Sequence, residues 1–174
     1  SETDGSGTIS LNATEPISQI TYEVEGQLTT SGQMLSDSEF TFSNSFNSAS
    51  SNSQQITVNN EKVSRISINS QGGEPELIIS SNVVNQMTYN GSKAKDSITI
   101  EADTLTKKNS TFNLGKKPDD ITFLGELKKT TVDLGDDKAV DRVTLNSTDQ
   151  ITAKRLRINN FSKRDELVID GEPC

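Results

Sequence analysis

Short apolar–polar–apolar triplets recur along the chain from Ile56 onward. Neighbouring side chains of a strand point to opposite faces, so this alternation predicts short β-strands with one buried face. Successive triplets begin 21 to 24 residues apart. The triplets span residues 56–58, 77–79, 98–100, 121–123, 143–145 and 167–169. The chain therefore contains a repeat of about 22 residues over most of its length.

A second short strand follows each of the first five triplets, at residues 66–68, 87–89, 112–114, 132–134 and 156–158. Two short strands joined by turns of variable length are typical of one coil of a β-solenoid, whose coils stack about 4.8 Å apart. We therefore predict an all-β fold, a β-solenoid with two-strand coils of about 22 residues. An antiparallel β-sandwich made of successive hairpins is the alternative, and a closed barrel is a third outcome.

Stacked coils would align equivalent side chains in columns along the outside of the molecule. The column on the first strand would contain Thr57, Ile78, Thr99, Thr122, Thr144 and Val168. The column on the second strand would contain Ser67, Thr88, Asn113, Asp133 and Arg157. A flat, uncharged β-branched ladder reflects strand propensity or forms a contact face for another copy. The first column is therefore the candidate interface.

The first third of the chain does not keep this spacing. Its strand-like segments lie at residues 8–11, 20–24 and 39–42, and a Ser/Asn-rich low-complexity stretch at residues 43–55 predicts a loop. The open end of a repeat array needs protection, because unpaired strand edges invite strand addition. We predict an irregular β N-terminal cap or attachment segment at residues 1–55, followed by a β-repeat domain at residues 56–174.

The composition favours an elongated or assembling fold. Only 30% of the residues are hydrophobic and 5% are aromatic, which is low for a compact domain. The net charge is −8, and the basic residues are interspersed with acidic ones, so we expect no nucleic-acid binding. No stretch approaches the roughly 18 apolar residues of a membrane span, so we also expect no membrane insertion.

The sequence offers little catalytic chemistry. It contains no His, the commonest general base, and Cys174 is its single Cys, so Cys-based zinc sites are excluded. An Asp precedes four of the triplets and can accept turn amides there. These residues are Asp96, Asp119, Asp141 and Asp165. We assign no catalytic residue and expect a protein that is not an enzyme.

One acidic cluster surrounds the turn at Gly135. Calcium binds six to eight oxygen ligands, and acidic turns between strands can supply them. The candidate calcium ligands are Asp133, Asp136, Asp137 and Asp141. The other interpretation is a set of solvated turns, and we expect no other cofactor.

Residues 95–171 resemble repeat segments of large secreted hemolysin-type proteins, with the stretch Thr-Val-Asp-Leu-Gly-Asp-Asp at residues 131–137 at the centre. They are also similar to β-structural segments of bacteriophage appendage and decoration proteins. The glycine-rich nonapeptide of calcium-binding β-rolls, G-G-x-G-x-D, is absent. The resemblance implies a repetitive β structure and brings no catalytic residue.

We therefore expect a non-enzymatic structural protein of a larger assembly, which forms homo-oligomers or attaches to other protein subunits. The first hypothesis is a phage virion component, such as a capsid decoration, knob or fibre protein. The second is a secreted bacterial cell-surface or matrix protein, or a filament subunit, located outside the cell. The third is a carbohydrate-binding β-solenoid.

Overall fold

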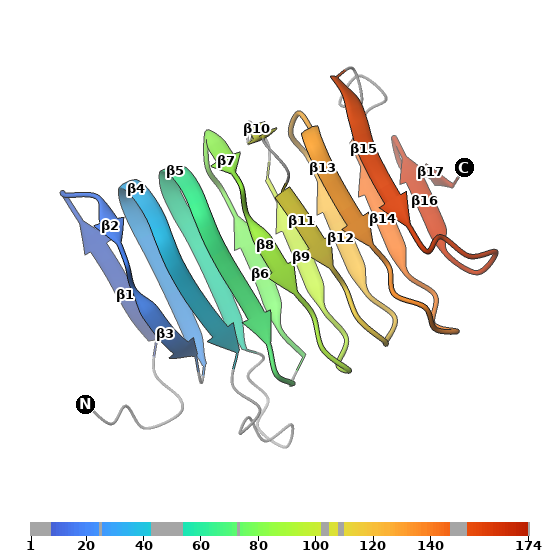
Figure 1. The fold of residues 1–174 in the computed structure, drawn as a ribbon, viewed down its shortest axis with the longest axis horizontal. Helices are drawn as coiled ribbons and strands as arrows, with labels where there is room; N and C mark the ends of the chain where they lie inside the picture. The colour runs from blue at the N-terminus through green and yellow to red at the C-terminus, as the bar shows by residue number, and fades with distance from the viewer. Residues whose placement is uncertain are drawn as a thin grey trace.

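The computed structural model describes residues 8–24, 26–42, 54–72, 74–101, 105–107, 110–146 and 153–173, and every regular element within them is a β-strand. The strands stack side by side from the N-terminal end to the C-terminal end (Figure 1). In chain order they are β1 (Thr8–Ala13), β2 (Ile17–Ser18), β3 (Thr21–Val24), β4 (Gln27–Phe42), β5 (Gln55–Ser70), β6 (Glu76–Ile79), β7 (Val83–Asn85), β8 (Thr88–Asn90), β9 (Ser97–Ile100), β10 (Leu105–Lys107), β11 (Ser110–Asn113), β12 (Asp120–Phe123), β13 (Lys128–Asp133), β14 (Arg142–Leu145), β15 (Ala153–Asn159), β16 (Glu166–Ile169) and β17 (Glu172–Pro173).

The strands pair in parallel and in register from one coil to the next. Glu76 of β6 lies opposite Gln55 of β5 and Ser97 of β9, and this column continues through β12, β14 and β16. Among the described residues only the short β17 pairs antiparallel, with β16. Parallel pairing at a spacing of 21 to 24 residues confirms the predicted β-solenoid and excludes the antiparallel sandwich.

Each coil contributes to two sheets with the core between them. Sheet A contains β1, the first parts of β4 and β5, and then β6, β9, β12, β14 and β16. Sheet B contains the remaining strands except β17, with β2 and β3, β7 and β8, and β10 and β11 as the two halves of bent strands. Phe112 of sheet B packs edge-to-face on Phe123 of sheet A, with the ring centroids 5.5 Å apart.

The N-terminal segment belongs to the same stack. The first part of β4 lies in register with β5, so that Leu28 faces Ile56, and β1 pairs in parallel with β4. The segment for which an irregular cap was predicted therefore adds β1 to β4 to the stack, and its role as a cap stays a prediction. Gln27 and its partner Gln55 are 28 residues apart, which is longer than the later spacings. Most of the predicted Ser/Asn-rich loop, residues 43–53, lies outside the described residues.

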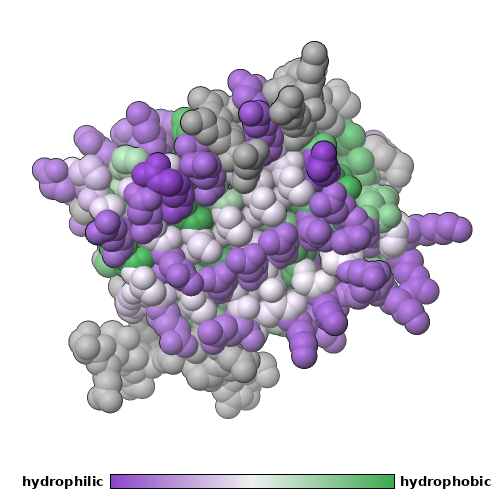
Figure 2. Space-filling model, viewed as in Figure 1, coloured by the Kyte–Doolittle hydropathy of each residue, from purple (hydrophilic) through white to green (hydrophobic). Residues whose placement is uncertain are grey.

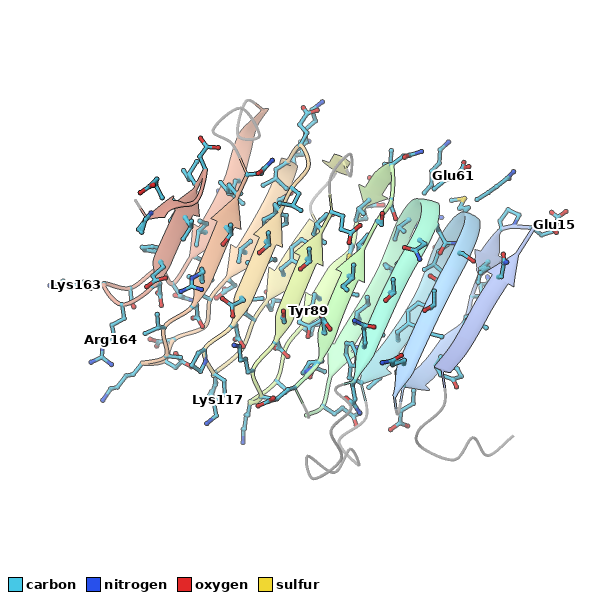
Figure 3. The ribbon with its side chains drawn as sticks, turned by 180° about the vertical axis from the view of Figure 1, so that it is seen from behind. Glu15, Glu61, Tyr89, Lys117, Lys163 and Arg164 are labelled. Atoms are coloured by element: carbon cyan, nitrogen blue, oxygen red, sulfur yellow. The ribbon has the colours of Figure 1, made fainter. Side chains whose placement is uncertain are left out.

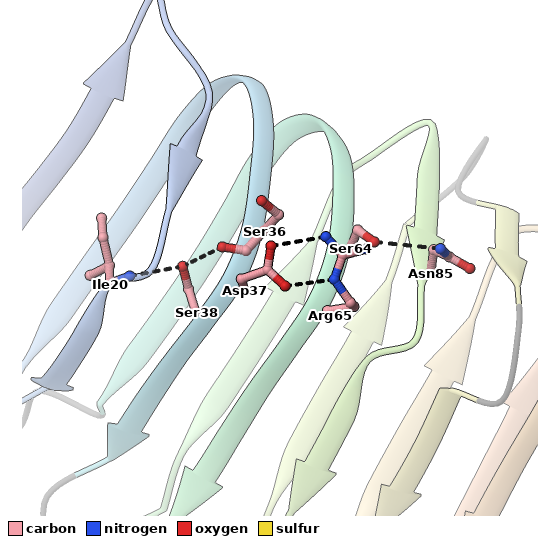
Figure 4. A network of polar contacts seen from close by, with 7 residues as sticks. All are labelled: Ile20, Ser36, Asp37, Ser38, Ser64, Arg65 and Asn85. Carbon is pink, nitrogen blue, oxygen red and sulfur yellow. Dashed lines mark hydrogen bonds and ion pairs between the residues drawn. The ribbon is translucent and has the colours of Figure 1, made fainter.

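A column of left-handed residues bends sheet B. Gln19, Asp37, Arg65, Gln86 and Lys129 have φ values between 49° and 56°, although none is glycine. The strand registers place the first four at the same point of successive coils. Arg65 donates two hydrogen bonds to the Asp37 carboxylate across this bend, at 2.5 and 2.9 Å (Figure 4). The bend is therefore a repeated feature of the coil.

The core is less completely covered at the ends of the stack than inside it. Val143 and Leu145 of β14 are fully buried, whereas Leu167 and Ile169 of β16 are only partly buried. Leu11, Ile20 and Tyr22 are partly buried at the N-terminal end, as are Leu156 and Ile158 at the C-terminal end. Figure 2 shows a largely polar visible face, with apolar side chains gathered toward the C-terminal end.

Candidate functional site

The outer column of sheet A has the predicted register. Its residues alternate with the buried ones on each short strand, and each is about half-buried. The strand pairings align Thr57, Ile78, Thr99, Thr122, Thr144 and Val168. They form a continuous ladder of small and β-branched side chains on one face. Its role as an interface stays a prediction.

Polar and charged side chains border this ladder. Gln55 donates a hydrogen bond to Glu76 at 2.8 Å. Arg142 forms ion pairs with Glu166 at 2.8 Å and with Asp120 at 3.9 Å. These contacts link successive coils, but exposed pairs of this kind add little to stability. The outer column of sheet A is therefore a narrow, uncharged strip that is bordered by charged side chains.

The outer column of sheet B differs from the prediction. Thr88 lies opposite Thr111, and Thr111 lies opposite Thr131, which in turn faces Arg157. The prediction placed Asn113 and Asp133 in this column, which is two residues too far along each strand. A slip of two residues keeps every side chain on its correct face, so alternation alone does not detect it.

Asn113 belongs to an amide ladder beside that column. Asn113 donates to Asn90 at 2.9 Å, Asn90 donates to Asn69 at 2.8 Å, and Asn69 donates to Glu39 at 2.8 Å. Each amide can donate to one neighbour and accept from the other, so the bonds link successive coils. This ladder fixes the coil register on the outside of sheet B.

The four aspartates that precede the triplets form a second ladder, which is buried except at Asp165. The Asp96 amide donates to the Asp119 carboxyl at 2.7 Å, the Asp119 amide to Asp141 at 3.0 Å, and the Asp141 amide to Asp165 at 3.1 Å. The prediction that these carboxyls accept turn amides is confirmed for Asp119, Asp141 and Asp165, and in each case the amide comes from the preceding coil. Asp165 also accepts an amide of its own turn, from Ser162.

Burial makes ionisation of this ladder unfavourable. Asp96, Asp119 and Asp141 are at most 2% exposed. Burial raises the pKa of Asp96 to about 7, of Asp119 to about 8 and of Asp141 to about 6. Hydrogen bonding offsets part of each increase, from Tyr89 and then the Ser92 backbone for Asp96 and from the backbone of the preceding coil for the other two. Neighbouring carboxylates add to the increase for Asp119 and Asp141. The ladder therefore favours neutral carboxyl groups.

The ladder ends at Pro75, which lies opposite Asp96 in the preceding coil and has no N–H to donate to the Asp96 carboxyl. The Pro75 carbonyl accepts a hydrogen bond from the Ser97 amide. The Asp96 carboxyl and the nearby Tyr89 hydroxyl are buried, and neither makes a hydrogen bond of normal geometry. Burial, and then the Asp96 charge, raise the pKa of Tyr89 well above its usual value. Both groups are shielded from solvent.

The candidate calcium ligands do not converge. Asp133 accepts from the Gly135 amide at 3.0 Å and from Asn160 at 2.8 Å, and Asp137 accepts from the Ala139 amide at 2.7 Å. Asp141 belongs to the buried ladder, whereas Asp136 is exposed. Over the residues that the structure describes, no group of three or more acidic, His or Cys side chains is placed to hold a metal ion. Calcium binding stays a prediction without a formed site.

Nothing in the sequence signals the contact between Tyr89 and Asp96 or the amide ladder. The amide ladder had one available signal, an Asn two residues after an outward position in three consecutive coils, at Asn69, Asn90 and Asn113. The absence of an amide at Pro75 could also have been read from the register.

The fold places the chain in the class of β-solenoids, with about six turns. No protein-family model matches the chain, and no curated protein or solved structure matches it significantly. Over the described residues, no helix is long and apolar enough to cross a membrane.

Proposed function

We propose that this chain is a non-enzymatic structural protein of a larger assembly, joined to other protein subunits through the ends of its coil stack. The observation that carries this proposal is the incomplete cover of the core at both ends. Ile158, Leu167 and Ile169 are partly exposed where their equivalents one coil inward are fully buried. Another subunit stacked there would remove this apolar surface from water.

The ionisable groups support a structural role. Side chains with raised pKa values mark functional sites when a substrate can reach them. Here Asp96, Asp119 and Tyr89 are at most 1% exposed, and Asp119 accepts a hydrogen bond from a backbone amide of the preceding coil. Their altered pKa values follow from burial within the fold, which fits a structural role.

A phage virion component, such as a capsid decoration, knob or fibre protein, is the first specific form of this proposal. A secreted cell-surface or matrix protein is the second. Parallel coils at both ends favour a head-to-tail filament in that case, because such contacts do not close on themselves. The resemblance of residues 95–171 to phage and hemolysin-type segments supports both forms.

Native mass spectrometry of the natural material, with and without a calcium chelator, separates the two. A discrete oligomer, or a chain that copurifies with phage particles and is indifferent to chelation, supports the virion form. Open-ended polymers, or assemblies that dissolve on chelation, contradict it and favour the surface protein.

A pair of variants tests the role of the stack ends. Ile158→Glu places a charge on the partly exposed core at the C-terminal end, and we expect it to weaken the assembly. Val140→Glu, at a side chain 45% exposed in a turn, is the matched control and should leave the assembly intact. Circular dichroism checks that both variants fold. A natural assembly that persists unchanged in Ile158→Glu would contradict the proposal.

A further inference from the structure

One long edge of the solenoid carries a row of unpaired cations. The row lies in the four turns that lead from sheet B back to sheet A, at residues 91–96, 114–119, 134–141 and 160–165. Its members, which we call the basic edge, are all exposed and form no ion pair with any described residue. They are Lys93, Lys116, Lys117, Lys138, Lys163 and Arg164.

These turns stack directly on one another. The Lys116 amide donates to the Ser92 carbonyl at 3.2 Å, and the Arg164 guanidinium donates to the Lys138 carbonyl at 3.2 Å. A Cβ atom at Gly135 would lie 2.0 Å from the Gly115 carbonyl oxygen, so the second and third turns are in close contact. The cations are therefore held in a row with a rise of about 4.8 Å per coil.

The row follows the length of the stack. Figure 3 shows Lys117, Lys163 and Arg164 along one edge, with Glu61 on the opposite edge. The basic edge therefore runs along the stack and reaches its C-terminal end at Lys163 and Arg164.

The charge on this edge contrasts with that of the whole chain. Residues 1–61 contain eight acidic and no basic residues, whereas residues 62–174 contain 17 of each, so the net charge of −8 lies entirely in the first part. In these turns three carboxyls that are not buried oppose the six cations, namely Asp136, Asp137 and Asp165, while Asp96, Asp119 and Asp141 are buried. The edge thus carries an excess of about three positive charges over the four turns.

We propose that the basic edge binds a linear acidic polysaccharide that carries one carboxylate per sugar. Such a chain carries a row of carboxylates, and the stacked turns carry a row of cations that rises about 4.8 Å per coil, so opposite charges can meet along the edge. Lysine suits this contact, because its flexible ammonium is a point charge that follows a mobile anion. Phe161, 47% exposed in the last turn, offers an apolar surface to a sugar ring.

Single-stranded nucleic acid fits the edge less well. Proteins that bind it combine a basic groove with several aromatic side chains on which successive bases stack. Phe161 is the one exposed large aromatic side chain among the described residues. The basic edge has no such series, so a uniformly charged glycan is the better match.

The test measures binding of an oligogalacturonate of defined length by isothermal titration calorimetry at low salt. The edge variant is Lys93→Gln/Lys116→Gln/Lys163→Gln. Its matched control is Lys62→Gln/Lys128→Gln/Lys129→Gln, which removes the same charge from side chains outside these turns. Neutral dextran and oligothymidylate are the comparison ligands, and circular dichroism confirms that both variants fold.

We expect the wild-type chain and the control to bind oligogalacturonate, and the edge variant to bind at least about tenfold more weakly. Its affinity should also depend less steeply on salt, because fewer counterions are released. No binding by the wild-type chain, equal losses in the two variants, or equal binding of neutral dextran would overturn the proposal. Tighter binding of oligothymidylate would replace the glycan with a nucleic acid.

Discussion

The substitution Asp119→Asn tests whether the buried aspartate ladder favours neutral side chains. An Asn oxygen can still accept the Asp96 amide, which now donates to Asp119 at 2.7 Å. The Asn nitrogen replaces Oδ2 of Asp119, which is buried without a hydrogen-bond partner. The variant therefore keeps the hydrogen bond from the Asp96 amide and removes the ionisable carboxyl group of residue 119.

The magnitude follows from the two pKa values. The Asp119 carboxyl has a pKa of about 8 in the folded chain, against an ordinary value of 3.8. Between these pH values the folded chain holds a proton that the unfolded chain has released, so the contribution to stability falls as pH rises from about 4 and is fully lost above about 8. At about 1.4 kcal/mol per pH unit the upper bound is about 6 kcal/mol.

The neighbouring carboxyls reduce this figure. Asp96 and Asp141 titrate over pH ranges that overlap with that of Asp119, and both raise the pKa of Asp119. The loss of folding stability with rising pH is therefore distributed over the three carboxyls. We expect Asp119→Asn to be about 2 to 3 kcal/mol more stable than the wild type at pH 9. At pH 4 the two should be nearly equal, because the wild-type carboxyl is then protonated.

Urea unfolding followed by far-ultraviolet circular dichroism at pH 4 and pH 9 provides the measurement. Asp136→Asn, which alters an exposed carboxyl in the next turn, is the control and should leave the pH profile unchanged. If Asp119→Asn loses as much stability as the wild type between pH 4 and pH 9, the buried carboxyl is not the source of the pH dependence.

Four further substitutions test the backbone and the amide ladder. Gly135→Ala should cost about 3 kcal/mol, because the new Cβ would lie 2.0 Å from a backbone oxygen at a φ of +83°. Gly171→Ala, with a φ of +81° and no atom within 4 Å of the Cβ, should cost only about 1 kcal/mol, and equal losses in urea unfolding would refute the steric explanation. Gln86→Gly should stabilise by about 0.5 to 1 kcal/mol, because glycine relieves a φ of 56° at a smaller entropic cost, and a lower thermal midpoint would contradict this. Asn90→Ala removes two amide hydrogen bonds and should cost about 1 to 2 kcal/mol, whereas an unchanged urea midpoint would show that the ladder does not stabilise the coil.

The sequence predicted sheet A well because each of its strands repeats one strong signal. A β-branched triplet follows a polar turn at nearly constant spacing, and the aligned column from Thr57 to Val168 has the predicted register. In sheet B several outward positions are equally polar. From the sequence, Thr111 and Asn113 fit the outer column equally well. The structure shows that Thr111 is the residue opposite Thr88, because the length of the turns sets the register.

Other features left too weak a signal in the sequence. The spacing of 28 residues between Gln27 and Gln55 hides the fact that β4 is a coil of the same stack. The left-handed column contains Gln86 and Lys129 rather than glycine, so no residue type marks it. For the candidate sites, the position of the aspartate ladder was predicted, but its amide donors follow from the coil register, which links residues 22 to 24 positions apart.

The unequal coil lengths have a consequence for the evolution and engineering of this scaffold. β4 and β5 remain in register along both sheets, although the segment that joins them is longer than the later connections. Lengthening a connection on that side of the stack does not disturb the ladders that hold neighbouring coils together. New sequence can therefore be acquired there without a new fold, and the same position is suitable for displaying a foreign peptide on a rigid rod.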